Sequence, residues 1–380
     1  MAKISNLKSP AIAGVVKKRN VKEDVMNILI KNGKVWNGER FLFSDVFIRD
    51  KKIEKVEPQI TSDADFVYDA TGEIVSAGLI DMHTHLSGIS CESFGTDPDL
   101  SCIPFGVCYA MDCGAAFGNK EFAQNFILKT KVFSPVAIKN NHISTETVRK
   151  MMNEYGEKLI GIKVCFDDSQ CDARGVTPLL EARDFASANN LKIMVHCTSS
   201  PVKMTEIAKV LRKGDIITHP YHGGKNSSSD NNFEALKIAK EKGIIIDSGL
   251  AGHVHTDFGI LKKALNLGLI PDTISTDITC KSAYVRGGKY GMTMCMSIFK
   301  DLGMNEEDIF RSVTSGAAKA ACIENEAGYL LPGRLADISV FKYDNEKYDL
   351  TDNWSHQRVF SDKSYKCTMT ICNGAVVYRR

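Results

Sequence analysis

The stretch that decides the fold is IVSAGLIDMHTHL, residues 74–86, an apolar run that ends in two histidines separated by one residue. A continuous apolar run of this length is typical of a buried β-strand. In a strand, residues i and i+2 point to the same face, about 7 Å apart. His83 and His85 would therefore emerge together at the carboxyl end, where two neutral imidazoles can bind one metal ion. Alone, such a pair also fits a solvated loop, so the rest of the chain must decide.

Eight apolar runs in all, separated by helix-like segments, extend along the middle of the chain. The runs are Val75–Asp81, Val107–Met111, Val132–Ile138, Leu159–Cys165, Leu191–His196, Asp215–His219, Gly243–Asp247 and Asp272–Asp277. This alternation predicts an α/β protein with a parallel sheet buried on both faces. Eight units over about 250 residues match a (β/α)8 TIM barrel. A doubly wound open sheet is the alternative, but no glycine-rich phosphate loop follows the first run.

The two ends of the chain predict a second, smaller unit. Short strand-like segments follow residue 28, where Asn32-Gly33 indicates a hairpin turn, and strands return after residue 338. We expect these segments to form one small β-sandwich domain. The predicted division is a tail at 1–27, the first part of the small domain at 28–73, the barrel at 74–330 and the second part of the small domain at 331–380.

Composition excludes several classes of protein. The chain is 43% hydrophobic and 25% charged with a formal net charge of +2, so no basic field for nucleic acid is expected. No run approaches the roughly 20 apolar residues of a membrane helix. The 12 cysteines are scattered, and the short apolar run near the N-terminus has its charges on the wrong side for an export signal. These features predict a cytoplasmic protein with reduced thiols and no membrane partner.

Candidate metal ligands stand at the carboxyl ends of the predicted strands, where barrel active sites lie. They are His83 and His85 after the first run, Lys163 in the fourth, His196 and His219 at the ends of the fifth and sixth, and Asp277 at the end of the eighth. A single strand-end histidine is more often only hydrogen-bonded. Six residues of these types at one end of a barrel indicate a metal centre instead.

Lys163 lies inside an apolar strand, where an ammonium group is costly to bury. One interpretation is an ion pair with a nearby aspartate. The other is that burial favours the neutral amine, which can react with CO2 to form a carbamate with two oxygen ligands. Four histidines and one aspartate exceed a single tetrahedral site, so a bridging carbamate between two metals is chemically sensible.

This order of residues resembles the amidohydrolase superfamily in its binuclear, carboxylated-lysine form, and the similarity covers nearly the whole chain. The matching segments are GIK at 161–163, MVH at 194–196, GDIITH at 214–219 and PDTISTD at 271–277, and they are similar to a dihydroorotase-like amidohydrolase/deacetylase branch. The resemblance implies that His83, His85 and Asp277 hold one metal. It also implies that His196 and His219 hold a second one, with carboxylated Lys163 between them.

The implied reaction is hydrolysis of an amide C–N bond by a hydroxide shared between two divalent ions, with Zn2+ the default from nitrogen-rich ligands. Asp277 would take the proton and pass it to the leaving nitrogen. An esterase or lactonase using the same site, and a non-catalytic scaffold, are the alternatives.

The substrate is expected to be a small N-acyl or cyclic amide compound that carries a negative charge. Ser87 stands where dihydroorotases of the family have a carboxylate-binding arginine, so dihydroorotate itself is not expected. The candidate substrate contacts are Arg286, His253 and Lys225, with a solvated loop as the alternative for His253 and for its neighbour His255. A homo-oligomer is compatible with this fold.

Overall fold

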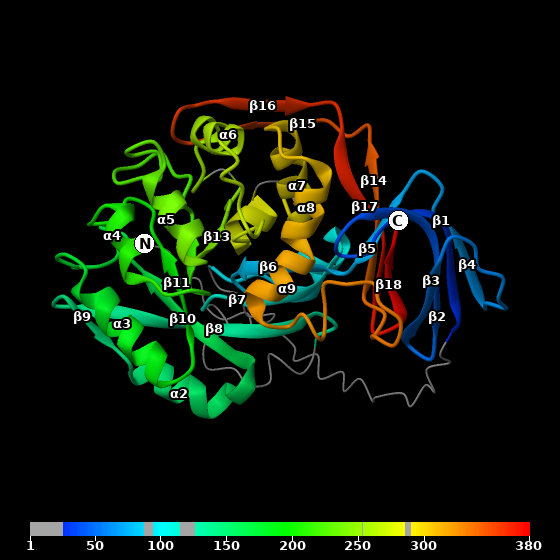
Figure 1. Ribbon diagram of the computed structural model, residues 1–380, viewed down its shortest axis with the longest axis horizontal. Helices are drawn as coiled ribbons and strands as arrows, with labels where there is room; N and C mark the ends of the chain where they lie inside the picture. Colours follow the sequence, from blue (N-terminus) through cyan, green and yellow to red (C-terminus); the bar gives the residue numbers. More distant parts are fainter. Residues whose placement is uncertain (1–25, 87–93, 115–125, 253, 286–289) are drawn as a thin grey trace, which may run out of the picture.

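The molecule consists of a barrel with helices around it and a separate sheet built from both ends of the chain (Figure 1). This computed structural model describes residues 26–86, 94–114, 126–252, 254–285 and 290–380. Nearly all of the predicted tail at 1–27 therefore lies outside the described residues. The predicted combination of a barrel with a small β domain is confirmed.

The separate sheet joins the N-terminal and C-terminal strands in the order β18-β17-β14-β5-β1-β2-β3, with β4 paired to β1. Its strands are β1 (Ile28–Trp36), β2 (Phe41–Arg49), β3 (Lys52–Glu57), β4 (Phe66–Asp69), β5 (Ile74–Ala77), β14 (Ile338–Asp344), β17 (Ser364–Cys372) and β18 (Ala375–Arg379). One buried apolar cluster joins residues of both chain ends, among them Ile28, Val75 and Ile338. The C-terminal strands thus complete the layer that the N-terminal strands begin, as predicted.

The predicted hairpin at Asn32-Gly33 is wrong. β1 continues through these residues, and its pairing with β2 shifts register between Ile30 and Gly33. Asn32 has a left-handed backbone with φ of 60°, and its N–H donates to the Asp45 carboxylate at 2.8 Å. The left-handed residue that a turn would use makes a β-bulge here instead.

Within the described residues, the barrel contains seven parallel strands in sequential order. They are β6 (Leu79–Thr84), β7 (Val107–Asp112), β8 (Lys129–Lys139), β10 (Leu159–Cys165), β11 (Lys192–His196), β12 (Ile216–Thr218) and β13 (Ile245–Asp247), while β9 (His142–Ser144) pairs antiparallel with β8. β6 and β10 to β12 carry buried residues at nearly every position, which is typical of a sheet covered on both faces.

The eighth predicted run, Asp272–Asp277, closes the barrel without forming a regular strand. It makes isolated parallel bridges, from Thr273 to Asp247 on one side and from Ile278 to Thr84 on the other. The Asp277 N–H donates to the His83 carbonyl at 2.8 Å. The eighth position of the barrel is therefore filled, and it brings Asp277 next to the end of β6.

The first predicted strand, Val75–Asp81, is in fact two strands that belong to different sheets. β5 pairs with β1 and β14, and β6 begins the barrel. The switch occurs at Gly78, whose N–H donates to Asp337 just before β14, whereas the next N–H, of Leu79, donates to Gly106 just before β7. A Cβ at Gly78 would lie 2.4 Å from Cys108 Sγ, so only glycine fits. We propose Gly78 as the boundary between the small domain and the barrel.

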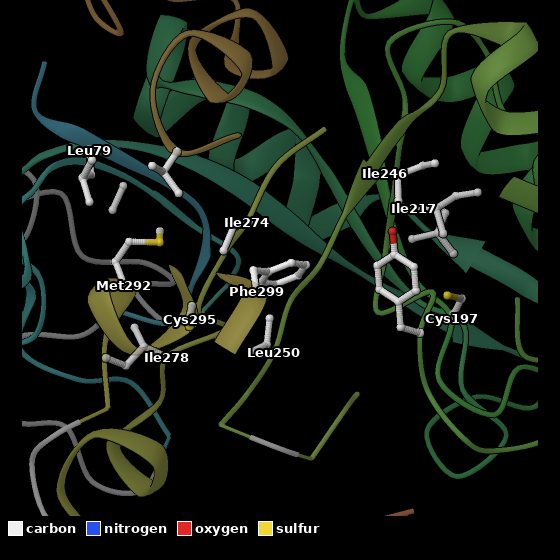
Figure 2. Packing of buried hydrophobic residues seen from close by; sticks show 14 of the residues in the cluster. Leu79, Cys197, Ile217, Ile246, Leu250, Ile274, Ile278, Met292, Cys295 and Phe299 are labelled. Carbon is white, nitrogen blue, oxygen red and sulfur yellow. The ribbon is translucent and has the colours of Figure 1, made fainter. Parts of the chain in front are cut away.

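Helices cover the barrel and bury apolar residues against it. They are α1 (Pro98–Cys102), α2 (Glu146–Tyr155), α3 (Thr177–Ala188), α4 (Met204–Val210), α5 (Glu234–Lys242), α6 (Phe258–Asn266), α7 (Met292–Asp301), α8 (Glu306–Val313) and α9 (Ser315–Ala321). Figure 2 shows Phe299 of α7 near Ile274 and Leu250 in this apolar layer. In the described part of the chain, no helix is long and apolar enough to span a bilayer.

An excursion of the C-terminal segment lies across the barrel helices. It is the antiparallel hairpin of β15 (Tyr348–Thr351) and β16 (Arg358–Ser361), between β14 and β17 in sequence. In Figure 1 this hairpin extends over α6 and α7 from the side of the separate sheet. Its tip, residues 352–357, reaches the loops that follow β12 and β13. Trp354 Nε1 donates a hydrogen bond to the Val254 carbonyl after β13, and Trp354 Cβ packs against Gly223 after β12.

Candidate metal centre and active site

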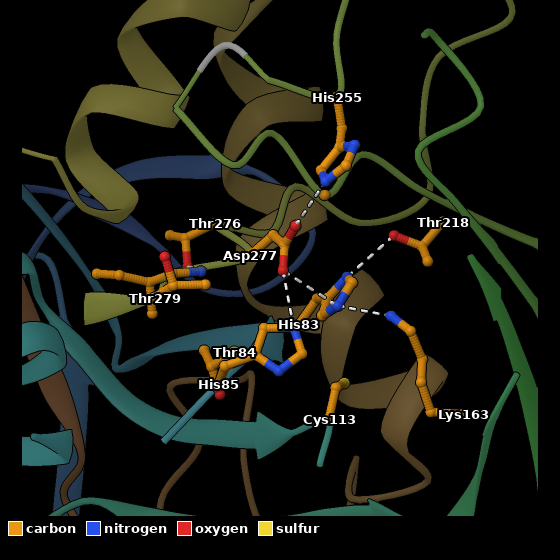
Figure 3. A network of polar contacts seen from close by, with 12 residues as sticks. His83, Thr84, His85, Cys113, Lys163, Thr218, His255, Thr276, Asp277 and Thr279 are labelled. Atoms are coloured by element: carbon orange, nitrogen blue, oxygen red, sulfur yellow. Dashed lines mark hydrogen bonds and ion pairs between the residues drawn. The ribbon is translucent and has the colours of Figure 1, made fainter. Parts of the chain in front are cut away.

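Asp277 lies at the centre of the candidate site, between two groups of histidines (Figure 3). Its Oδ1 lies 3.3 Å from His83 Nε2 and 3.0 Å from His85 Nε2. Its Oδ2 lies 3.8 Å from His219 Nε2 and 3.7 Å from His255 Nε2. One carboxylate therefore faces both groups, with a different oxygen toward each.

Two sets of ligand atoms are close enough for each to hold a metal ion. The first set is His83, His85 and Asp277, and the second is His196, His219 and His255. Within each set all ligand atoms lie within 4.8 Å of one another. Five of the six predicted ligands thus fall into these two sets, and the sixth, Lys163, lies beside the first.

Lys163 Nζ lies 2.6 Å from His83 Nε2, and Lys163 as a residue is only 4% exposed. Among the described residues, no carboxylate forms an ion pair with this amine; its other close contact is Met194 Sδ at 3.5 Å. The ion-pair interpretation of Lys163 therefore finds no partner in the described part of the chain. A buried lysine amine beside metal-ligand candidates suits carboxylation.

Four of the five histidines in these two sets have pKa values lowered by burial, which favours the neutral form that binds metals. Burial lowers the pKa of His83 to about 4, with a further contribution from the charge of Lys163. Burial likewise lowers the pKa of His255 to about 3 and the pKa values of His196 and His219. Burial by itself would raise the pKa of Asp277, but His83 and His85 together hold it below its ordinary value. The site therefore combines neutral imidazoles with an ionised carboxylate.

Unpaired buried nitrogens support a metal at this place. His196 Nε2 and His219 Nε2 are buried and have no hydrogen-bond partner among the described residues. A buried polar atom without a partner costs about 1–3 kcal/mol, and a bound metal ion would remove that cost. The donor set, imidazoles with one carboxylate, is the set that zinc prefers. The residues present therefore fit a pair of metal ions.

A second layer of polar residues orients His83. Its Nδ1 lies 3.0 Å from Thr218 Oγ1, and the Thr218 hydroxyl donates to Asp247 at 2.7 Å. Asp247 also accepts hydrogen bonds from Thr273 and Ser275 at 2.6 and 2.9 Å. This network fixes the ring of His83 and leaves its Nε2 facing the site.

Two carboxylates near the site were not predicted from the sequence. Asp167 Oδ2 lies 3.5 Å from His196 Nε2, and its Oδ1 accepts hydrogen bonds from the Ser169 backbone and hydroxyl. Asp81 accepts from the Thr276 hydroxyl at 2.6 Å and so supports the residue before Asp277. Asp167 follows the end of β10 and Asp81 lies inside β6, a charged residue within an apolar strand, and these positions are the signals that could have indicated them.

The three predicted substrate contacts are not brought together in the described part of the chain. His253 and Arg286 lie outside the described residues. The side chain of Lys225 is 53% exposed and forms an ion pair with Asp168. His255, for which a solvated loop was the alternative, instead lies in the site. The loop after β13 contains two histidines, and sequence alone did not show that His255 lies in the site.

Comparison with known proteins identifies the family of this chain. The model of the Amidohydrolase family matches residues 175–377, more than half of the chain, and the chain belongs to this family. It is 28% identical over 372 residues to a deacetylase of Enterococcus faecalis, covering 92% of this chain and 98% of the relative. It is 24% identical over 437 residues to a dihydroorotase of Lactobacillus acidophilus, covering 93% and 99%.

Solved structures show the same architecture. An adenine deaminase superposes with a TM-score of 0.80 at 25% identity, covering 93% of this chain and all of that one. A dihydroorotase superposes with a TM-score of 0.79 at 22% identity, covering 93% and 99%, and this likeness concerns the fold alone. The resemblance stated from the strand-end residues is confirmed. The chain is a hydrolase that acts on carbon–nitrogen bonds other than peptide bonds.

Proposed function

We propose that this enzyme is a two-metal hydrolase that cleaves the amide bond of a small N-acyl or cyclic amide substrate. The observation that carries the proposal is Asp277, whose two oxygens face two separate groups of buried imidazoles. A single metal ion would leave the imidazoles of one group without a metal to bind. The names of the relatives, deacetylase and dihydroorotase, support the same bond type.

In this proposal His83, His85 and Asp277 hold the first metal, and His196 and His219 hold the second. Lys163 would join both sets in carboxylated form: its amine nitrogen would bond to the carbon of CO2 and release one proton, and the carbamate would offer two oxygen ligands. The buried amine without a carboxylate partner supports this assignment. The ions, when bound, supply a hydroxide at neutral pH and polarise the carbonyl that it attacks.

Asp277 is the proposed general base and acid. Its carboxylate is ionised, so it can take a proton from the attacking water and hold it on one oxygen. The same carboxyl group then donates that proton to the leaving nitrogen, which restores the carboxylate. The hydrogen bond from the Asp277 N–H to the His83 carbonyl keeps the backbone, and with it the carboxylate, in place during the transfer.

An anionic group on the substrate is part of the proposal, with Arg286 as the contact. A guanidinium can grip a carboxylate with two parallel hydrogen bonds. Lys225 is the weaker candidate, because its amine would have to leave Asp168 first. If Arg286→Ala leaves KM unchanged for every substrate that is turned over, the carboxylate part of this proposal is wrong.

The test combines metal analysis with a substrate screen. Enzyme loaded with zinc in bicarbonate buffer should hold two equivalents of metal per chain. It should hydrolyse one or more compounds among N-acyl amino acids and cyclic amides, and leave dihydroorotate unchanged. Acyl esters, lactones and adenine form the comparison panel. Turnover of esters alone would favour an esterase, release of ammonia from adenine would favour a deaminase, and a metal-free chain without turnover would indicate a scaffold.

A further inference from the structure

His255 gives the second metal group a third imidazole that the predicted ligand set does not contain. It follows β13 in the chain, and its ring centroid lies 4.3 Å from that of His219 and 5.0 Å from that of His196. The three ligand atoms lie within 4.8 Å of one another. Figure 3 shows His255 reaching Asp277 from the side opposite to His85.

The ring of His255 is oriented by a hydrogen bond on its outer nitrogen. Nδ1 lies 3.1 Å from Thr198 Oγ1, in the loop that follows β11. With Nδ1 engaged there, Nε2 is the nitrogen that faces the site, 3.7 Å from Asp277 Oδ2. Metal-binding histidines typically hold their second nitrogen in this way, by a hydrogen bond that fixes the ring.

The backbone around His255 is anchored on both sides. The carbonyl of Val254 accepts a hydrogen bond from Trp354 Nε1 at 2.8 Å, at the tip of the β15–β16 hairpin. Two residues after His255, the Asp257 N–H donates to the Tyr221 carbonyl at 2.8 Å, and the Asp257 carboxylate caps α6. His255 is therefore held in the site by contacts from three separate parts of the fold.

We propose that His255 is a third imidazole ligand of the second metal in the resting enzyme, a role that rests on the proposed two-metal function. His196, His219 and His255 would then complete a nitrogen-rich set together with carboxylated Lys163. Three imidazoles and a carbamate oxygen are donor types that zinc accepts, and a hydroxide would be a fifth ligand, a coordination number that catalytic zinc can reach. A substrate oxygen that binds this metal must then expand the set or replace His255. His255 and the substrate would therefore compete for the second metal.

Metal release tests the proposal without relying on turnover. Wild type, His255→Ala and His255→Asn are loaded with zinc and titrated with a chelator. His142→Ala, which changes an exposed histidine on β9, is the control. In both His255 variants the dissociation constant of the more weakly held equivalent should rise at least ~10-fold, the scale seen when a group that fixes a metal ligand is removed. The other equivalent should keep its wild-type value, and so should both equivalents in the control.

Cobalt substitution supplies a second readout. Removal of one imidazole should change the visible absorption of Co2+ in the second site, and X-ray absorption of the wild type should count five imidazoles over two metals. The wild-type measurement does not depend on whether a variant folds. Four imidazoles, or unchanged metal release and cobalt absorption in the His255 variants, would overturn the proposal. A raised KM with unchanged metal binding would make His255 a substrate contact.

The two proposals fail in different ways. A wild-type chain that never binds a second equivalent overturns the two-metal function and this ligand assignment together. A wild-type chain with two equivalents whose His255 variants release metal normally overturns the role of His255 alone.

Discussion

Replacement of Asp277 by asparagine separates its proposed role in proton transfer from its role in holding a metal. Asp277 has a left-handed backbone with φ of 49°, and asparagine is one of the few residues that adopts this conformation readily. Asp277→Asn therefore keeps the side-chain volume, the backbone and one oxygen that can bind metal. It removes the negative charge and the capacity to hold a proton.

The expected loss follows from that difference. A positioned general acid–base contributes about 10²–10⁴ in rate, which corresponds to about 3–5 kcal/mol in the activation barrier. We expect kcat of Asp277→Asn to fall by this factor on any substrate that the screen identifies. Because His83 and His85 remain at 3.0–3.3 Å from the position of Oδ1, most of the first metal should be retained.

The assay is steady-state kinetics across pH together with metal content by mass spectrometry. Asp277→Ala is the matched comparison: it removes both oxygens and places alanine at a positive φ, so it should also lose metal and stability. Near-normal turnover of Asp277→Asn with both metals in place would refute the base role. A loss of rate that is explained entirely by lost metal would refute it equally.

Three further predictions concern the residues around the metals. Lys163→Ala should lose the second zinc and lower kcat by at least ~10³, because the bridging carbamate cannot form; full zinc content and activity in bicarbonate-free buffer would contradict the carbamate. Burial lowers the pKa of His222 to about 4 from 6.5. The unfolded chain therefore binds more protons between these values, and stability present above pH ~6.5 is lost as the pH falls toward 4. Between pH 7 and pH 5, the free energy of unfolding measured in urea should fall by about 2 kcal/mol less in His222→Asn than in wild type. An equal fall in both proteins would contradict this role of His222. Trp354→Phe leaves the Val254 carbonyl without its indole donor, so stability should fall by about 1 kcal/mol and the second metal should be released faster; unchanged release would show that the hairpin does not support the site. Gly223→Ala should have the same effect by another route, because a Cβ there would lie 2.5 Å from Trp354 Cβ and displace that side chain.

The positions of the metal-ligand candidates could be predicted because parallel strands present their carboxyl ends at one face. His196 ends β11, His219 follows β12 directly, and His83 is the penultimate residue of β6, so an apolar run followed by a polar residue was a sufficient signal. Lys163 was identified by the opposite signal, a charged residue inside an apolar strand.

Other features could not be read from local sequence because distant contacts decide them. The run at residues 74–80 looks like one strand, and its division at Gly78 depends on Asp337 and Gly106, which hydrogen-bond to consecutive residues. Asn32-Gly33 has the composition of a hairpin turn, yet the Asp45 carboxylate binds the Asn32 N–H and stabilises a bulge. In both cases contacts with residues distant in sequence decided the local structure.

His255 shows the same limit within the site. Its sequence neighbourhood is a loop without periodicity, and no strand end marks it. Its place beside His219 depends on Thr198 from one loop and on Trp354 from a hairpin about 100 residues further along the chain. A single sequence carries no signal that connects these three segments.

The division at Gly78 also bears on how the chain is made. β5 lies between β1 and β14, so the central position of the separate sheet stays open on one side until the C-terminal strands have been synthesised. β6, which carries His83, continues directly from β5 with only Gly78 between them. During translation the first metal ligands would thus be tethered to a sheet that is still incomplete. The sheet to which the strand of His83 is joined is therefore complete only when β14, β17 and β18, all beyond residue 337, have been synthesised.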